Sequence, residues 1–235
     1  LIEIFQEARE MGINVIRTWG FYDSSDSSDD AVIQISPGMF NEKGLISLDY
    51  VISKANEYNI KLIIPLVNNW EDYGGMNQYV QWYSEYFPSP LKEEMQSKLF
   101  TQKFIEGVDG RFYKFFITAN LTHDDFYTNE TIKNWFKNYI STLLNRTNSF
   151  TKIKYKNEPS ILAWELANEP RSSDISGNII YNWADEISTY IKSIDSNHLI
   201  STGEEGFDIT AIYYAVGKYG EQKWLFDGSS GISFY

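Results

Sequence analysis

The apolar run Ile161–Ala167 constrains the fold of this chain more than any other segment. It reads Ile-Leu-Ala-Trp-Glu-Leu-Ala, without a regular alternation of apolar and polar residues. A strand that faces water on one side alternates, whereas a nearly continuous apolar run is typical of a parallel sheet covered on both faces. The run therefore predicts an α/β fold built on a parallel sheet.

Strand-like and helix-like segments alternate along the rest of the chain. Further strands are predicted at residues 13–19, 61–67, 198–203 and 231–235. Apolar residues recur at helical spacing in four groups, which are Leu1, Phe5, Ala8 and Met11; Leu48, Val51, Ile52 and Ala55; Ile132, Trp135, Tyr139 and Leu143; and Ile180, Trp183, Ile187 and Ile191. Gly12 follows the first group and is a candidate C-cap for that helix. This order predicts strand–helix–strand units with right-handed crossovers. The interval from 61 to 161 exceeds one crossover, and we expect long, functional loops at 73–86 and 87–126.

Charge and composition limit the partners. The 235 residues carry 20 Lys+Arg and 32 Asp+Glu, a formal net charge of −12, which argues against nucleic acid and against an anionic membrane surface. No apolar run is long enough to span a membrane, and the first residues do not have the pattern of a signal peptide. Because cysteine is absent, disulfides, Cys-ligated metals and thiol nucleophiles are excluded.

Three other features of the sequence are ambiguous. Aromatic residues make up 17% of the chain, which suits either a large core or a cleft that stacks on sugar rings. Sequons begin at Asn120, Asn129 and Asn145, but a chain this rich in Asn, Ser and Thr contains about three by chance. The acidic segment Asp23–Asp30 lacks EF-hand spacing, so we expect a solvated loop rather than a calcium site.

The strongest chemical signal is the segment Trp164–Arg171, at the end of the buried run. By strand alternation Glu165, Ala167 and Glu169 share one face, and Pro170 is expected to stop the strand. Reacting groups of parallel α/β barrels sit where strands end, and a carboxyl there can have a raised pKa and act as a general acid. The alternative interpretation is that Glu169 only caps a turn.

The ends of the other predicted strands also carry polar and aromatic residues. Val15, Arg17 and Trp19 share a face, and an inward arginine needs a carboxylate partner, either as a plain ion pair with Glu165 or in support of catalysis. Two further strand ends read Asn-Asn-Trp at 68–70 and Gly-Glu-Glu-Gly-Phe at 203–207. This distribution is typical of a site rather than of a core layer.

Five segments in order resemble glycoside hydrolase family 5, specifically the endo-β-1,4-mannanases of fungi and plants. They are Val15–Trp19, Leu62–Trp70, His123–Tyr127, Trp164–Arg171 and Gly203–Phe207. The resemblance covers nearly all of the chain, and only Ser89–Leu121 lacks a recognisable pattern. It implies a (β/α)8 TIM barrel and retaining hydrolysis of internal β-1,4-mannosidic bonds in mannan, glucomannan or galactomannan.

The resemblance also implies roles for particular residues. Glu169 would be the catalytic acid/base, and Asn168 would hold the sugar 2-hydroxyl in the −1 subsite. Arg17 would support catalysis by orienting the nucleophilic carboxylate and keeping it ionised. Trp19 and Trp70 would line the sugar cleft, and Arg171 and Glu205 would contact the aglycone side.

The family's nucleophile is a Glu at the end of the seventh barrel strand, and no residue of this chain matches it. By strand counting, residues 1–235 form a partial catalytic domain that covers strands two to six, without strand one and strands seven and eight. Glu205 belongs to the motif of strand five, so it is not assigned the role of nucleophile. We therefore expect a fragment of a longer enzyme, inactive and prone to aggregate by itself.

Alternatives to a mannanase remain open from the sequence. They are a related β-1,4-glycan hydrolase or transglycosidase of the same fold, and a non-catalytic carbohydrate-binding protein. A metal enzyme is disfavoured because His123 and His198 are far apart in sequence, and His198 is expected to be structural. No cofactor or metal is expected, and the expected partners are mannan and manno-oligosaccharides. The family implies secretion, and we expect a monomer.

Overall fold

Four parallel strands form the main sheet. The computed structural model describes residues 1–87, 103–106, 112–115, 121–174 and 176–205. The strands are β1 (Val15–Arg17), β4 (Lys61–Pro65), β7 (Ile161–Glu165) and β8 (Leu199–Ser201), in the spatial order β1-β4-β7-β8. Every neighbouring pair is parallel, which confirms the prediction from the apolar run. The strand predicted at 231–235 lies outside the described residues.

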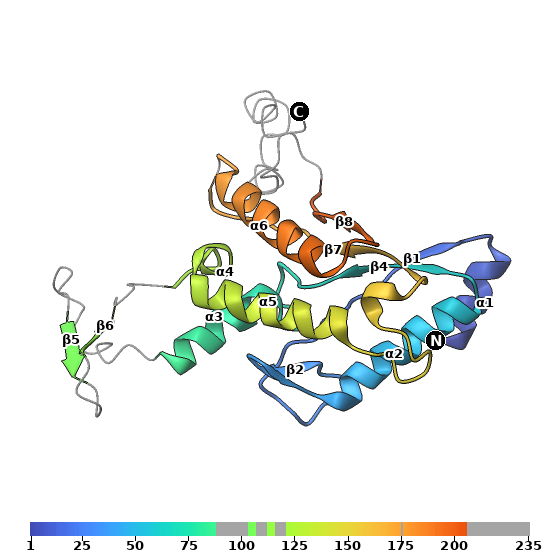
Figure 1. The fold of residues 1–235 in the computed structure, drawn as a ribbon, viewed down its shortest axis with the longest axis horizontal. Coiled ribbons are helices and arrows are strands. Elements are labelled where there is room, and N and C mark those ends of the chain that lie inside the picture. Colours follow the sequence, from blue (N-terminus) through green and yellow to red (C-terminus); the bar gives the residue numbers. More distant parts are fainter. Residues whose placement is uncertain (88–102, 107–111, 116–120, 175, 206–235) are drawn as a thin grey trace, which may run out of the picture.

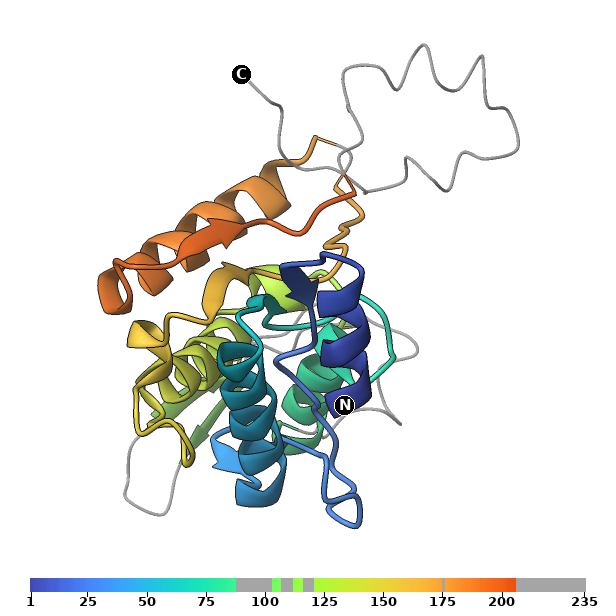
Figure 2. The same ribbon diagram turned by 90° about the vertical axis from the view of Figure 1, so that its right-hand side faces the viewer.

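One helix precedes the first strand, and other helices connect the strands of the sheet (Figure 1). The four predicted helices are α1 (Ile2–Glu10), α2 (Glu42–Glu57), α5 (Glu130–Asn145) and α6 (Asn178–Ile194). Figures 1 and 2 both show α6 beside β8, the strand that follows it. The structure also contains two antiparallel strand pairs and a 3-10 turn at Tyr155–Asn157. The pairs are β2 (Gln34–Ser36) with β3 (Met39–Phe40) and β5 (Lys103–Glu106) with β6 (Phe112–Phe115).

The prediction of a long loop at 73–86 is wrong, because helix α3 (Gly75–Tyr86) occupies most of it. Met76, Tyr79 and Trp82 recur at helical spacing and are buried. The adjacent Gly74 and Gly75 conceal the start of the helix, since no side chain caps it. Within 87–126 the structure describes part of the segment, including β5, β6 and the beginning of the short helix α4 (Asp125–Thr128).

Aromatic rings build much of the core. Trp82, Trp164 and Trp183 are almost completely buried. The rings of Phe136 and Trp183 stack at a centroid distance of 6.2 Å, and Phe126 lies 5.2 Å from Phe136. The core therefore accounts for a large share of the aromatic composition, which the sequence left open.

Asp23 corrects the expectation of a solvated loop at 23–30. Its side chain is 1% exposed, and its Oδ1 accepts a hydrogen bond of 3.0 Å from Gln34 Nε2. Burial raises the pKa of Asp23 to about 8. Asp26, Asp29 and Asp30 are exposed, as predicted. The composition of the segment concealed one residue that folds inward.

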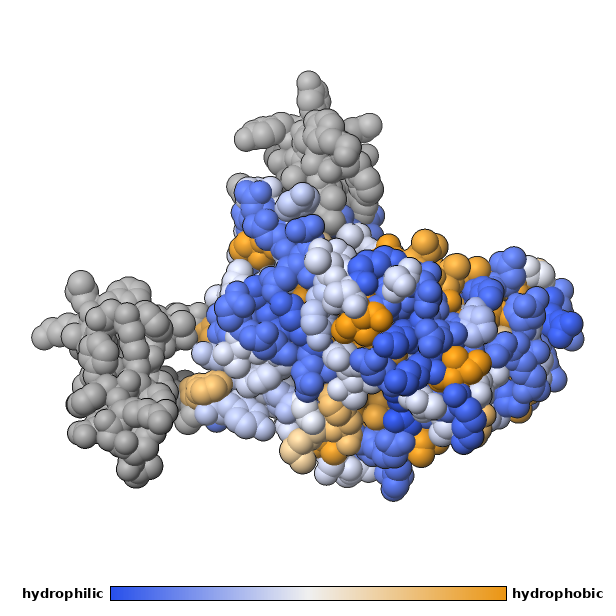
Figure 3. Space-filling model, in the orientation of Figure 1, coloured by the Kyte–Doolittle hydropathy of each residue, from blue (hydrophilic) through white to orange (hydrophobic). Residues whose placement is uncertain are grey.

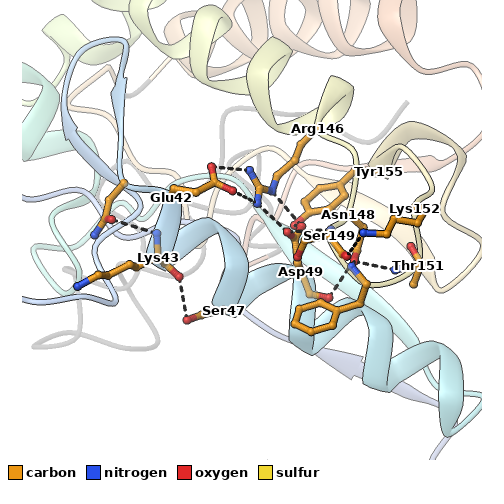
Figure 4. Close-up of polar contacts among 12 residues, drawn as sticks. Glu42, Lys43, Ser47, Asp49, Arg146, Asn148, Ser149, Thr151, Lys152 and Tyr155 are labelled. Atoms are coloured by element: carbon orange, nitrogen blue, oxygen red, sulfur yellow. Dashed lines mark hydrogen bonds and ion pairs between the residues drawn. The ribbon is translucent and has the colours of Figure 1, made fainter.

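A buried ion cluster ties α2 to the chain that follows α5 (Figure 4). Asp49, which is fully buried, accepts hydrogen bonds from Arg146 Nε at 2.9 Å, Arg146 Nη2 at 2.6 Å and the Tyr155 hydroxyl at 2.6 Å. Glu42 binds the same guanidinium nearer the surface. Burial alone would raise the pKa of Asp49, but the hydrogen bonds from Arg146, Tyr155 and Ser149 outweigh it and hold the pKa below its ordinary value.

The visible face of the molecule is largely hydrophilic, with scattered apolar patches (Figure 3). Among the described helices, none is both long enough and apolar enough to cross a membrane.

Candidate active site

Polar side chains gather at the edge of the sheet where the parallel strands end. Asn68, Asn69 and Trp70 follow β4, and Asn168 and Glu169 follow β7. A bridge between Asn68 and Asn168 continues the pairing of the two strands beyond their ends. Since parallel strands end at the same edge, residues about 100 positions apart in sequence become neighbours there.

Arg17 binds Glu165, the partner expected from the sequence. Arg17 Nε lies 3.1 Å from Glu165 Oε1 and 3.2 Å from Oε2, and Nη2 also donates to Oε1. The guanidinium compensates a carboxylate that is only 6% exposed. Arg17 Nη2 also donates to Asn168 Oδ1 at 2.8 Å, and Asn168 Nδ2 donates to Asn68 Oδ1 at 2.9 Å. The ion pair expected for Arg17 is therefore present among the described residues, and the same guanidinium also binds Asn168, the residue before Glu169. The supporting role of Arg17 in catalysis stays a prediction.

Glu169 lies beyond the end of the strand. The strand β7 stops at Glu165, and Glu169 has a left-handed φ of 51°. The prediction that Glu165, Ala167 and Glu169 share one face is therefore wrong for Glu169, because alternation holds only for extended backbone. Pro170 likewise does not end the strand. The Glu169 side chain is half-buried, and its Oε2 accepts a hydrogen bond of 2.7 Å from Trp70 Nε1.

The remaining predicted site residues fall into two groups. Trp70, 41% exposed, lies under the Arg171 guanidinium at 5.3 Å from ring centroid to Cζ, and Arg171 Nε donates to Glu205 Oε2 at 2.7 Å. Trp19 is half-buried and stacks with Arg17 at 5.2 Å. The structure thus links Glu169 to Trp70 directly, and through Trp70 to Arg171 and Glu205. Trp19 lies apart from this group, in contact with Arg17.

Two open hollows adjoin the pair formed by Trp70 and Arg171. One, of about 350 Å³, includes Arg171 in its lining, and the other, of about 530 Å³, includes Trp70. Both are also lined by Asn69 and His123. Their walls are rich in amide, carboxylate and hydroxyl groups, which suit ligands with many hydroxyl groups.

Sequence reasoning assigned no role to several residues of this edge. Gly203 has a φ of 80°, and a Cβ there would lie 1.8 Å from Ala167 O and 2.8 Å from Glu165 Oε1. Only glycine allows β8 to end so close to β7. Next to it, burial raises the pKa of Glu204 to about 7. The available signal for the close approach at Gly203 was a glycine as the last residue of the strand predicted at 198–203, whereas the sequence held no signal for the burial of Glu204.

The described residues contain no group of three or more His, Cys, Asp or Glu side chains arranged to hold a metal ion. His198 is buried, its Nδ1 lies 2.6 Å from Asp195 Oδ2, and its Nε2 lies 3.0 Å from Glu158 O, which confirms the predicted structural role. His123 lies at the candidate site, with its Nε2 3.3 Å from Asn69 O.

Comparisons with known proteins agree on one family. Residues 2–216 match the sequence model described as GH family 5 beta-mannosidase-like. Mannan endo-1,4-beta-mannosidase 3 of Arabidopsis thaliana is 39% identical over 205 residues, which are 87% of this chain and 41% of that protein. Mannan endo-1,4-beta-mannosidase 4 of Solanum lycopersicum is 40% identical over 204 residues, 86% of this chain and 43% of that protein.

Solved structures show the same likeness. A hyperthermostable endo-1,4-beta-D-mannanase from Thermotoga petrophila has a TM-score of 0.73 and 38% identity, over 99% of this chain and 58% of that one. The endo-1,4-beta-mannanase from Rhizomucor miehei has a TM-score of 0.71 and 36% identity, over 99% of this chain and 57% of that one. The four-stranded sheet is thus part of a (β/α)8 barrel, as predicted. The chain spans about two fifths of the length of the curated relatives.

Proposed function

Because the chain belongs to the GH family 5 β-mannosidase-like family, we propose that the protein containing it is a retaining endo-β-1,4-mannanase with Glu169 as its acid/base. The observation that carries the proposal is the position of Glu169. Its carboxyl group lies at the carboxyl edge of the parallel sheet and is oriented by the hydrogen bond from Trp70 Nε1. Barrel enzymes place their reacting groups at this edge.

The neighbours of Glu169 suit a sugar in the −1 subsite. Asn168 is fixed by Arg17 and Asn68, so that its side chain could meet the sugar 2-hydroxyl in one orientation. Trp70 and Arg171 offer an aromatic face and a cation to the aglycone side, together with Glu205. The plant and microbial relatives named as mannan-cleaving enzymes support mannan and manno-oligosaccharides as the substrates.

The proposed mechanism is a double displacement. Protonated Glu169 gives its proton to the glycosidic oxygen while a second carboxylate attacks the anomeric carbon and the aglycone leaves. Ionised Glu169 then takes a proton from water, which attacks the same carbon and releases the second carboxylate. Glu165 is not proposed as that nucleophile, because the family's nucleophile is a Glu at the end of the seventh barrel strand, whereas Glu165 ends β7, the strand that precedes Glu169 itself. The nucleophile would come from outside the described residues.

The protein is proposed to act as a secreted monomer without a cofactor. A polysaccharide cannot enter a cell intact, so an enzyme that cleaves internal bonds would meet it outside. Measurement of the protein in culture medium against cell lysate tests the location, and its mass in solution tests the oligomeric state.

Rates on different polymers test the substrate, and a variant tests Glu169. We expect the full-length protein to cleave mannan and glucomannan and to leave carboxymethyl cellulose intact; a preference for the cellulose derivative would refute the mannanase assignment.

Glu169→Gln should lower kcat on mannan by about 10²–10⁴-fold and keep oligosaccharide binding. Glu85→Gln, on the exposed face of α3, is the matched control. Binding without turnover in the unchanged protein would indicate a carbohydrate-binding protein.

A further inference from the structure

Asn69 spans the backbone of Glu169. Its backbone N–H donates to Asn168 O at 3.0 Å, on one side of Glu169, and its Oδ1 accepts from Arg171 N at 3.0 Å, on the other side. Asn69 is 6% exposed, so these bonds are shielded from water. One residue of the neighbouring strand end therefore fixes the chain both before and after the candidate acid/base.

Tyr127 of α4 provides a second attachment at the same place. Its hydroxyl donates to Arg171 O at 2.9 Å and accepts from Arg171 N at 3.1 Å. The ring is 3% exposed and packs edge-on against Trp183 at 5.2 Å. Burial raises the pKa of Tyr127 well above its ordinary value, so the hydroxyl keeps the proton that it donates.

The backbone between these attachments needs external support. Glu169 has a φ of 51°, in the left-handed region that residues with a Cβ adopt only when their surroundings impose it. The next residue, Pro170, has no N–H with which to anchor the turn. The nearest N–H on its C-terminal side is that of Arg171, and Asn69 and Tyr127 both bind it.

We propose that Asn69 and Tyr127 are positioning residues that hold Glu169 in its left-handed conformation and so aim its carboxyl at the glycosidic oxygen. The inference rests on the proposed function of Glu169. Glu169 N donates to Gly203 O at 3.0 Å, which holds the N-terminal side of the turn, while Asn69 and Tyr127 hold its C-terminal side at Arg171. Without the bonds at Arg171, the turn would relax toward ordinary φ values and move the carboxyl away from Trp70 Nε1, its present partner. Neither residue would touch the reacting atoms.

The test compares two leaving groups in the full-length protein. A manno-oligosaccharide needs the proton from Glu169 to leave, whereas 2,4-dinitrophenol leaves a mannobioside without one. For Tyr127→Phe and Asn69→Leu we expect kcat/KM on the oligosaccharide to fall by about 10–100-fold, and on the dinitrophenyl mannobioside by less than about threefold. Asn69→Asp keeps the Oδ1 acceptor and should retain most of the activity on both.

Tyr155→Phe is the matched control, because it also removes a buried tyrosine hydroxyl, one that binds Asp49 instead of the Glu169 turn. It should lower the unfolding temperature and leave the ratio of the two kcat/KM values unchanged. Equal losses on both substrates, or no loss in the Tyr127 and Asn69 variants, would overturn the positioning role. If Asn69→Leu fails to fold, Tyr127→Phe decides the question.

Glu169→Gln, measured on the same two substrates, separates this inference from the proposed function. If the kcat/KM of Glu169→Gln falls on the oligosaccharide alone while Tyr127→Phe and Asn69→Leu match the unchanged protein on both substrates, only the positioning role fails. If Glu169→Gln itself shows no dependence on the leaving group, Glu169 is not the acid and the proposed function fails with it.

Discussion

The ion cluster around Arg146 permits a controlled test of how burial sets the strength of an ion pair. Two carboxylates bind the same guanidinium, but the Asp49 side chain is 0% exposed and the Glu42 side chain is 66% exposed. Asp49 also accepts from the Tyr155 hydroxyl and from Ser149 N. Conversion of either carboxylate to its amide removes one charge and almost no volume, so the two variants differ in burial and in the hydrogen bonds that burial brings to Asp49.

We expect Asp49→Asn to lower the free energy of unfolding by about 3 kcal/mol, the lower end of the range for breaking a buried pair, because Arg146 keeps Glu42 as partner. Glu42→Gln should lower it by less than about 1 kcal/mol, as exposed pairs do. Urea unfolding of both variants beside the unchanged protein measures the two values.

The pH dependence of the same pair of variants gives a second test. The pKa of Asp49 is lowered in the folded state, so its contribution is present above the unfolded pKa and is lost as the pH falls through the folded pKa. The difference between the unchanged protein and Asp49→Asn should therefore shrink below about pH 4. A loss in Asp49→Asn no larger than in Glu42→Gln at pH 7 would refute the reasoning.

Three further variants test other parts of the structure. The folded pKa of Asp23 is raised to about 8, so the contribution of this residue to stability declines as the pH rises from 4 to 8. Over this range the unfolding temperature of Asp23→Asn should rise relative to that of the unchanged protein. A difference that stays constant with pH would contradict the burial argument. Arg17→Lys removes the fork that binds Glu165, and urea unfolding should show a loss of about 1–3 kcal/mol rather than none. Gly203→Ala places a Cβ 1.8 Å from a backbone oxygen and should lower the free energy of unfolding by about 3 kcal/mol or more. Gly12→Ala, which has open space around the Cβ but a φ of 76°, should lower it by about 1 kcal/mol. Losses of equal size, measured by calorimetry, would argue against the close approach of β7 and β8.

The sequence predicted the parts of the fold whose periodicity reflects burial. The run at 161–167 revealed a central parallel strand because both of its faces are covered. Apolar spacing at Ile180, Trp183, Ile187 and Ile191 revealed α6, because those four residues face the core. Helix α3 was not predicted, because it begins at glycines and no side chain caps its first turn.

The candidate site was predicted as a set of residues but not as a geometry. Strand ends indicated Arg17, Asn68 and Glu169 as neighbours, since parallel strands end at one edge. Alternation then failed at Glu169, whose φ of 51° lies among contacts with residues distant in sequence: Asn69 and Tyr127 bind Arg171 N, and Glu169 N donates to Gly203 O at 3.0 Å. A backbone conformation imposed by tertiary contacts leaves no local pattern to read.

Azide rescue tests the central claim most directly. In full-length Glu169→Ala, dinitrophenyl β-mannobioside should still form the glycosyl-enzyme, since its leaving group needs no acid, but water would attack slowly without a base. Azide needs no base, so added azide should raise the turnover rate and yield the β-configured mannobiosyl azide. That product would establish a retaining mechanism with Glu169 as acid/base. An unchanged rate and no glycosyl azide would contradict this role for Glu169.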